Sequence, residues 1–254
     1  MKTEAAIRAA AERNFVGSYV KLVEHVAGAE LREFGAVTAF MTGVPIGIFN
    51  GCIAPSPPDP DELEAALDWV AEAGVPHCLW TPKDLAPELV PVADRRAMAA
   101  SDWILPHMAL TSRSEAPPAA PGVTVRQAND AGSLAEFRRV LVAGGVTAEI
   151  AARLFRASLL DDEDVRIVVA ALDGRTAGTA MAIRTGDVAG VYAVETTTDA
   201  RRRGVATAAT WAAVATGQAW GCDPIVLQSS RMGYGVYEAM SFRTVARYAI
   251  FRAP

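Results

Sequence analysis

The sequence has few of the residues that build disulfide frameworks and metal sites. It contains three cysteines and three histidines among 254 residues. The cysteines are odd in number and scattered, which excludes a disulfide framework. The histidines all lie in the first half and share no spacing typical of metal ligands, so we expect no metal at the functional site. These residues are Cys52, Cys78 and Cys222, and His25, His77 and His107.

The sequence also lacks a strongly apolar run and an excess of basic residues. One uncharged stretch, residues 204–222, contains threonine, glutamine and glycine and is too polar for a spanning helix of about 20 apolar residues. Residues 1–121 carry 9 Lys/Arg and 16 Asp/Glu, and residues 122–254 carry 15 and 13. Neither half is basic enough for a nucleic-acid partner. The charged start is unlike a signal peptide, so we expect a soluble, cytoplasmic protein without a membrane partner.

The length and the proline distribution indicate two modules. A chain of 254 residues exceeds one typical domain of roughly 100–200 residues. Hydrophobic residues make up 51% and charged residues 21%, which is enough apolar material for packed cores and excludes global disorder. Residues 112–121 hold three prolines without periodicity and are typical of an extended connector. We therefore expect an N-terminal domain at 1–112, a linker at 113–121 and a C-terminal domain at 122–254.

In the first half, the hydrophobic pattern predicts alternating helices and strands. We expect helices at 3–13, 18–27, from 61 onward and at 88–100, with acidic residues in the first turn of the third helix. Strands are expected at 37–41, 46–49, 77–80 and 103–110. The prolines at 55–60 indicate a loop before the third helix.

The second half has a more regular pattern. Strands are expected at 123–126, 165–171, 179–184, 188–194, 225–228 and 245–251, and helices at 134–142, 149–159, 204–219 and 235–240. This order predicts an α/β fold with a mixed sheet and helices on its faces. Residues 96–110 resemble residues 238–251 in pattern, since both contain a helix end, an aromatic residue and a terminal strand.

The segment 191–210 is the one that most clearly predicts a binding function. A strand ends near Glu195, and Arg201-Arg202-Arg203-Gly204 then leads into a long helix. The first N–H groups of a helix have no intrahelical partner, and the helix dipole favours an anion there. Arginines beside this positive helix end are unfavourable unless an anion is bound. The pattern favours an anion site over a solvated basic turn.

The same segment resembles the GNAT superfamily of N-acetyltransferases. Arg201-x-x-Gly204-x-Ala206 is similar to the family's Arg/Gln-x-x-Gly-x-Gly/Ala signature, and residues 226–242 are similar to its later strand, tyrosine-containing helix and Gly-Phe pair. The resemblance covers residues 122–254 and implies the GNAT acyl-CoA N-acyltransferase fold. Thr198, Ser230 and Ser241 depart from the family's common proline, asparagine and glycine. The resemblance implies a tandem member of the family, in which the first half is a degenerate GNAT-like domain without a cofactor site, so we expect a chain with two similar halves.

The resemblance implies a set of residues for acetyl-CoA. The strand end is implied to bind the pantetheine arm, the turn to bind the pyrophosphate, and Ser230 to contact the cofactor. Tyr237 matches the tyrosine that acts as general acid toward the thiolate. The implied cofactor-binding residues are Val194, Glu195, Thr196, Arg202, Arg203, Gly204, Val205, Ala206, Thr207 and Ser230.

Two residues are candidates for acid and base chemistry. A phenol with a pKa of about 10 can protonate a leaving thiolate, which suits Tyr237, although a core tyrosine is the alternative. Glu195 ends an apolar strand and is the candidate base, directly or through water; a surface carboxylate is the alternative. Main-chain N–H groups at residues 194–196 are expected to polarise the thioester carbonyl.

The resemblance implies acetyl transfer from acetyl-CoA to an amine by direct attack in a ternary complex. The alternative is a non-catalytic acyl-CoA-binding or regulatory module. The acceptor would be a small-molecule or peptide amine, and a homodimer is compatible with the sequence. The acidic first half would attract a cationic amine. We expect it to close over the acceptor cleft, with Phe40, Phe49, Asn50, Trp80 and Trp103 as candidate wall residues; a plain core position is the alternative for each aromatic residue.

Overall fold

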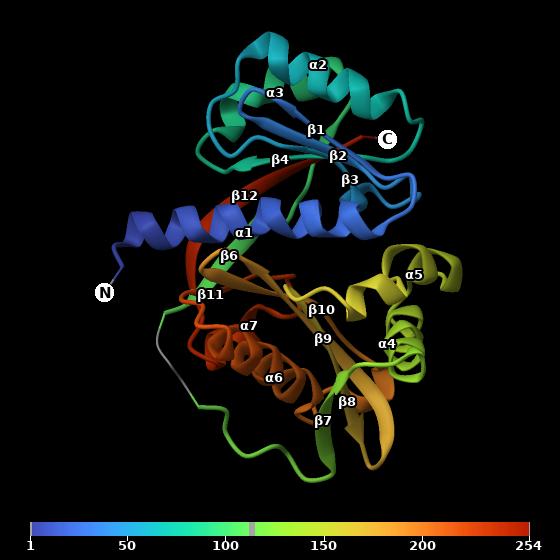
Figure 1. Cartoon of the computed structure of the whole chain (residues 1–254). Coiled ribbons are helices and arrows are strands. Elements are labelled where there is room, and N and C mark those ends of the chain that lie inside the picture. The colour runs from blue at the N-terminus through green and yellow to red at the C-terminus, as the bar shows by residue number, and fades with distance from the viewer. Residues whose placement is uncertain (1, 112–114, 254) are drawn as a thin grey trace.

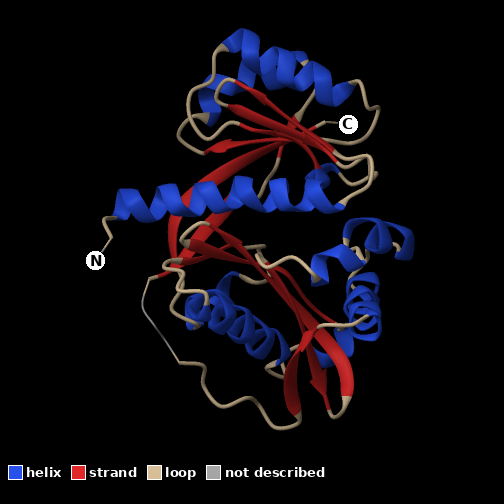
Figure 2. Cartoon of the chain, viewed as in Figure 1, coloured by secondary structure: helices blue, strands red, loops and turns tan. Residues whose placement is uncertain are grey.

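A single mixed sheet runs through the whole molecule in the computed structural model, which describes residues 2–111 and 115–253. The strand order is β1-β2-β3-β4-β12-β6-β11-β10-β9-β8-β7, and β5 pairs with β12 at its side. Helices cover both faces of the sheet, with one half of the molecule above the long helix α1 and the other below it (Figures 1 and 2). This arrangement confirms the expected α/β fold.

The first half begins with a long helix and continues with alternating strands and helices. Its helices are α1 (Glu4–His25), α2 (Pro60–Ala71) and α3 (Ala86–Arg95), with a 3-10 turn at Gly47–Phe49. Its strands are β1 (Glu30–Phe34), β2 (Val37–Met41), β3 (Asn50–Ile53), β4 (Cys78–Pro82), β5 (Ala99–Ala100) and β6 (Leu105–Leu110).

The second half follows the order expected from its sequence. Its helices are α4 (Ala131–Ala143), α5 (Ala148–Leu154), α6 (Val205–Ala219) and α7 (Tyr234–Ala239), with 3-10 turns at Ala157–Leu160 and Thr198–Ala200. Its strands are β7 (Val123–Ala128), β8 (Val165–Leu172), β9 (Arg175–Thr185), β10 (Val188–Thr196), β11 (Ile225–Gln228) and β12 (Arg243–Arg252).

The two halves exchange their last strands. Strand β6 of the first half pairs with β11, with Met108 opposite Leu227. Strand β12 of the second half pairs with β4, with Ile250 opposite Trp80. The two exchanged strands also pair with each other. A cut at residues 113–121 therefore separates segments of sequence but does not separate two independent sheets.

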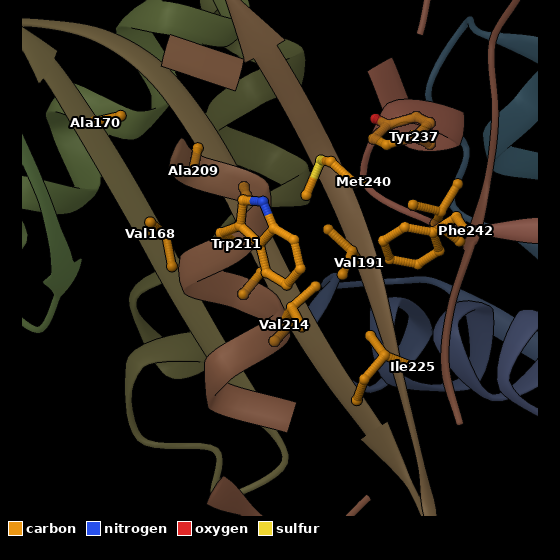
Figure 3. Close-up of a cluster of buried hydrophobic side chains, with 14 of the residues drawn as sticks. Val168, Ala170, Val191, Ala209, Trp211, Val214, Ile225, Tyr237, Met240 and Phe242 are labelled. Atoms are coloured by element: carbon orange, nitrogen blue, oxygen red, sulfur yellow. The ribbon is translucent and has the colours of Figure 1, made fainter. Parts of the chain in front are cut away.

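Distinct hydrophobic clusters lie on the two faces of the second half's sheet. Helices α6 and α7 pack through Val205, Trp211 and Tyr237 on one face, shown in Figure 3. Helices α4 and α5 pack through Phe137 and Leu154 on the other. Helix α1 also lies on this second face, where the Tyr192 hydroxyl donates to Asn14 Oδ1 at 2.6 Å. The first half thus covers part of the second half's sheet.

The structure corrects three expectations for the first half. The expected helix at 88–100 ends at Arg95, and Ala99–Ala100 form strand β5. The expected helices at 3–13 and 18–27 form the single helix α1. Gly17 lies inside this helix, at a point where the helix packs closely against the sheet. A Cβ at Gly17 would lie 2.5 Å from Thr185 Oγ1. The expected strand at 46–49 is wrong: residues 47–49 form a 3-10 turn, and the strand begins at Asn50. Asn50 is fully buried and its side chain accepts the N–H groups of Thr42 and Gly43, which holds the preceding loop.

The proline-rich connector approaches the second half closely. Residues 112–114, which include the first two residues of the expected linker, lie outside the described residues, and residues 115–120 have no regular secondary structure. A Cβ placed on Gly204 would come within 2.8 Å of the Ala120 methyl. The end of the connector therefore packs on the turn that precedes α6.

Among the described residues, the structure has no helix that is long and apolar enough to cross a membrane.

Candidate functional site

The start of α6 presents uncapped main-chain N–H groups. Gly204 is the N-cap residue with φ 81°, a left-handed conformation that favours glycine, and no side chain caps the helix. The first hydrogen bond within the helix runs from Ala208 N to Gly204 O. The N–H groups of Val205, Ala206 and Thr207 are thus at the positive end of a 15-residue helix, which is a favourable position for an anion.

Two of the three arginines before this helix pair with carboxylates of the chain. Arg203 Nη2 lies 3.3 Å from Asp173 Oδ2, and Arg201 Nη2 lies 3.8 Å from Glu195 Oε1. Arg202 is exposed, has φ 61°, and forms no ion pair within the described part of the chain. Two of the three arginine charges beside the helix start are therefore already paired with carboxylates of the chain. The uncapped main-chain N–H groups at the start of α6 are therefore the main evidence for an anion site.

Strands β10 and β11 separate beside the start of α6. Their parallel register ends at Val191 opposite Leu227, whereas β10 continues to Thr196. The register between β10 and β9 shifts between Tyr192 and Glu195, which marks a β-bulge, and Ala193 has φ 49°. Bulges re-aim side chains and end strand pairing. The expected cofactor residues Val194, Glu195 and Thr196 therefore lie where β10 is unpaired on its β11 side, while Glu195 and Thr196 still pair with β9.

The bulge directs neighbouring side chains to opposite faces of the sheet. Val194 packs with the cluster on the α6–α7 face. Glu195 points toward the end of α4, since a Cβ at Gly144 would lie 2.7 Å from the Glu195 carboxyl carbon. Its carboxylate accepts the Thr196 N–H at 3.0 Å, and the side chain is 27% exposed. Glu195 is thus accessible on the α4 side of the separated strands.

Tyr237 lies on the other face of the sheet, in the short helix α7. It is 8% exposed and packs edge-on against Phe242, with ring centroids 6.1 Å apart. Burial, followed by the negative charge of Glu195, raises the pKa of Tyr237 to about 12. The phenol therefore stays protonated at neutral pH, which is the form required for proton donation.

The remaining predicted cofactor residue, Ser230, organises the turn before α7. Its hydroxyl accepts the Gly233 N–H at 3.2 Å, and the preceding Ser229 is fully buried. Trp103 Nε1 donates to the Ser229 carbonyl at 3.1 Å, so a residue of the first half fixes the end of β11. The structure thus brings the predicted strand end, helix start and α7 tyrosine to one end of the β10–β11 pair.

Several residues near the site gave no recognisable signal in the sequence. The bulge at Ala193 depends on pairing with a distant strand, and alanine itself does not indicate it. Gln228, at the end of β11, has a buried amide nitrogen without a hydrogen-bond partner in the described structure. Among the expected wall residues, Phe40 and Trp80 are core residues of the first half, whereas Phe49 packs with the cluster on the α4–α5 face.

One cluster of candidate metal ligands appears in the described residues, and it is distant in sequence from the signature turn. It consists of Glu24, His25 and Asp162. The Lys21 ammonium lies 3.2 Å from both Glu24 Oε2 and Asp162 Oδ2. A fixed positive charge therefore already pairs these carboxylates, and the cluster joins α1 to the segment before β8.

Comparisons with known proteins agree with this arrangement. Residues 137–242 match the family described as Acetyltransferase (GNAT) family. A GCN5-related N-acetyltransferase from Kribbella flavida is similar in structure, with 20% identity, a TM-score of 0.69 and 95% coverage of each chain. One from Sphaerobacter thermophilus has 14% identity and a TM-score of 0.61, with 85% of this chain and 76% of that chain covered. No curated protein matches the sequence.

A further structure shares the arrangement of the whole chain. It is described as a tandem GNAT protein from the clavulanic acid biosynthesis pathway, with 13% identity, a TM-score of 0.60 and 96% coverage of each chain. At such identities the likeness shows the fold alone, and it agrees with two GNAT-like halves. Residues 137–242 thus match the GNAT acetyltransferase family, and the whole chain has a fold similar to that of GNAT proteins.

Proposed function

We propose that the protein transfers the acetyl group of acetyl-CoA to an amine. The observation that carries the proposal is the separation of β10 from β11 directly beside the uncapped start of α6. The N–H groups of residues 203–207, with Arg202 beside them, suit a diphosphate. The unpaired edge at Val194–Thr196 suits a pantetheine arm, whose amides can hydrogen-bond to it as another strand would.

The proposed reaction is a direct attack in a ternary complex. The amine nitrogen bonds to the thioester carbon, the carbon–sulfur bond breaks, and main-chain N–H groups at the bulge stabilise the carbonyl oxygen. Glu195, directly or through water, takes the proton that the amine loses. Tyr237 protonates the departing thiolate. Because the charge of Glu195 helps to raise the pKa of Tyr237, protonation of Glu195 makes Tyr237 a stronger acid when the thiolate leaves.

The positions of these two groups suit opposite roles. Glu195 faces α4 on one side of the sheet, and Tyr237 packs with α6 on the other. An acceptor on the α4 side would meet the carboxylate, while the donor sulfur would meet the phenol. The first half adds α1 to the acceptor side through Asn14 and Tyr192.

Thiol release from acetyl-CoA with a panel of primary amines tests the proposal. We expect release that depends on the amine, whereas a non-catalytic acyl-CoA-binding module would bind the donor without turnover. Glu195→Gln tests the base: we expect kcat/KM to fall by roughly 10²-fold with acetyl-CoA affinity unchanged. If kcat/KM of Glu195→Gln falls by less than about threefold, water alone accepts the proton that the amine loses.

A further inference from the structure

A polar cavity of about 490 Å³ lies between α4 and the turn from β8 to β9, beside the segment that follows β10. Ligand pockets typically have volumes of roughly 300–1,000 Å³, so the cavity can accept a small metabolite. We call it the α4 cavity. Its lining includes Glu136, Arg139 and Val140 of α4, together with Arg175, Thr197 and Asp199.

One positive charge in the α4 cavity has no counter-ion in the described part of the chain. Glu136 Oε2 lies 2.8 Å from Arg126 Nη2. Asp199 pairs with Arg175. Arg139 is exposed and forms no ion pair with any described residue. Since the other ionisable lining residues are already paired, the cavity favours an anion at Arg139.

The wall of the α4 cavity also contains a hydrogen-bond donor. Thr197 Oγ1 is buried and makes no hydrogen bond of normal geometry among the described residues. Buried polar atoms are usually paired, so this hydroxyl indicates a place for a polar ligand. A guanidinium holds a carboxylate through two parallel hydrogen bonds, and a single unpaired positive charge matches a carboxylate better than a phosphate dianion. The cavity therefore suits a carboxylate.

The α4 cavity adjoins the candidate base, Glu195. Val140 lines the cavity, and Gly144, which follows it on the same face of α4, lies against the Glu195 carboxyl group. These two positions are about 6 Å apart along the helix axis. Thr197 lies two residues beyond Glu195, which corresponds to about 7 Å in an extended chain. Both paths place the cavity one short carbon chain away from Glu195.

We infer that the acceptor is an ω-amino acid, whose carboxylate binds Arg139 in the α4 cavity while its amine meets Glu195. This inference rests on the proposed function and names its substrate class. An extended carbon chain advances by about 1.3 Å per bond, from bond lengths near 1.5 Å, so four or five methylene groups span the separation. The α-amine of an α-amino acid is too close to its carboxylate to occupy both places.

Matched acceptors test the carboxylate. Thiol release from acetyl-CoA is measured with 5-aminopentanoate and with 5-aminopentanamide, which has the same amine and chain length but no negative charge. We expect kcat/KM to be about tenfold higher or more for the acid, mainly through a lower KM, because hydrogen bonds to charged groups are the stronger ones. The short acid 3-aminopropanoate should show no preference over its amide.

A substitution in the α4 cavity tests the residue that reads the carboxylate. Arg139→Gln should reduce the preference for 5-aminopentanoate to less than about twofold, and it should leave the KM for acetyl-CoA and kcat/KM for the amide unchanged. Arg156 is also exposed, has no ion pair among the described residues and lies outside the cavity lining. Arg156→Gln is therefore the matched control and should keep the full preference.

The outcomes separate this inference from the proposed function. Equal kcat/KM for 5-aminopentanoate and its amide, or a preference that survives Arg139→Gln, would overturn the inference and leave the proposed function intact. If neither compound nor any other primary amine of the panel causes thiol release, the proposed function fails, and this inference fails with it.

Discussion

From β1 and β8 onward, and apart from the short β5, the two halves of the chain share strand and helix order, yet they differ at three positions beside the proposed donor site. Helix α2 of the first half corresponds in order to α6 of the second. The Asp59 side chain caps α2 by accepting the N–H groups of Asp61 and Glu62, and Pro60 begins the helix. Helix α6 has no side-chain cap. An anion would therefore meet a carboxylate at α2 and free N–H groups at α6.

The strands before α2 and α6 also differ, because one strand pair stays closed and the other separates. In the first half, β3 pairs with β4 through Ile53 and Trp80, and the Ala54 N–H still bonds to the Trp80 carbonyl. In the second half, β10 continues for five residues beyond its last pair with β11. The first half thus keeps the scaffold with a closed strand pair, and the second half opens the equivalent pair.

The short helices after these strands end in the same way but present different side chains. The Met98 N–H bonds to the Ala93 carbonyl, and the Phe242 N–H bonds to the Tyr237 carbonyl. Each bond follows a residue with positive φ, Ala97 or Ser241. Alanine therefore stands in the first half where the second half has its candidate acid. A GNAT-like fold therefore does not by itself create the proposed donor site.

The largest expected effect comes from removing the hydroxyl of Tyr237, which has no counterpart at Ala93 of the first half. Tyr237→Phe should lower kcat by roughly 10²–10⁴-fold, because the thiolate loses its proton donor. Tyr234→Phe, which removes another phenol hydroxyl from α7, is the control and should stay near the original rate. A loss of less than about threefold in steady-state thiol release for Tyr237→Phe would show that its role is wrong.

The next prediction places a carboxylate at the start of α6, as in α2. Gly204→Asp should weaken coenzyme A binding about 100-fold in calorimetry, since a like charge about 5 Å from a phosphate costs roughly 3 kcal/mol at an effective dielectric constant near 20.

Gly204→Asn has a similar size and the same backbone conformation without the charge, so it separates repulsion from strain and from contact with Ala120. Equal losses in the two variants would indicate that sterics, and not charge, explain the effect.

The reverse change in the first half should alter stability alone. Asp59→Ala removes the cap of α2 and should lower the free energy of unfolding by about 1 kcal/mol, measured by urea denaturation. Coenzyme A affinity should not change. A change in affinity would mean that the start of α2 communicates with the donor site, which would weaken the contrast between the halves.

The smallest expected effect is a change in the free energy of unfolding from substitutions at the ends of α3 and α7, which have the same backbone conformation. Ser241 has φ 68°, in the left-handed region where residues other than glycine are strained. Ser241→Gly should raise the free energy of unfolding by about 0.5 kcal/mol, as the relief of strain exceeds the entropy cost of glycine. Ala97→Gly, at φ 53°, is the matched change in the first half. Destabilisation in thermal unfolding of both variants would contradict this account of the strain.

Much of the second half could be predicted because its local signals agree. The strand before Arg201, the turn at Gly204 and the uncharged helix after it are all present as expected. The Schellman-type end of α7 also gives a reason for the family's glycine before Phe242, since Ser241 adopts positive φ there. The cofactor and catalytic roles of these residues remain predictions.

The rest depends on contacts between distant segments. Strand β1 was missed because it is short and carries Glu30, Arg32 and Glu33, as protected edge strands often do. The exchange of β6 and β12 arises from pairing across more than 100 residues, which no local pattern records. Similarly, the bulge near Ala193 depends on the register with β9.

The exchange also changes how the first half can be tested. Deletion of residues 1–112 would remove β6 from between β11 and β12, so we expect such a fragment to lose its fold. Point substitutions on α1, such as Asn14→Ala beside Tyr192, examine the acceptor side in the complete protein.

A crystal structure of the protein with coenzyme A bound would show directly where the diphosphate binds. We expect the diphosphate oxygens to accept hydrogen bonds from main-chain N–H groups within residues 203–207 and the pantetheine arm to lie beside Val194–Thr196. A diphosphate bound elsewhere on the molecule, with the start of α6 left to solvent, would contradict this expectation.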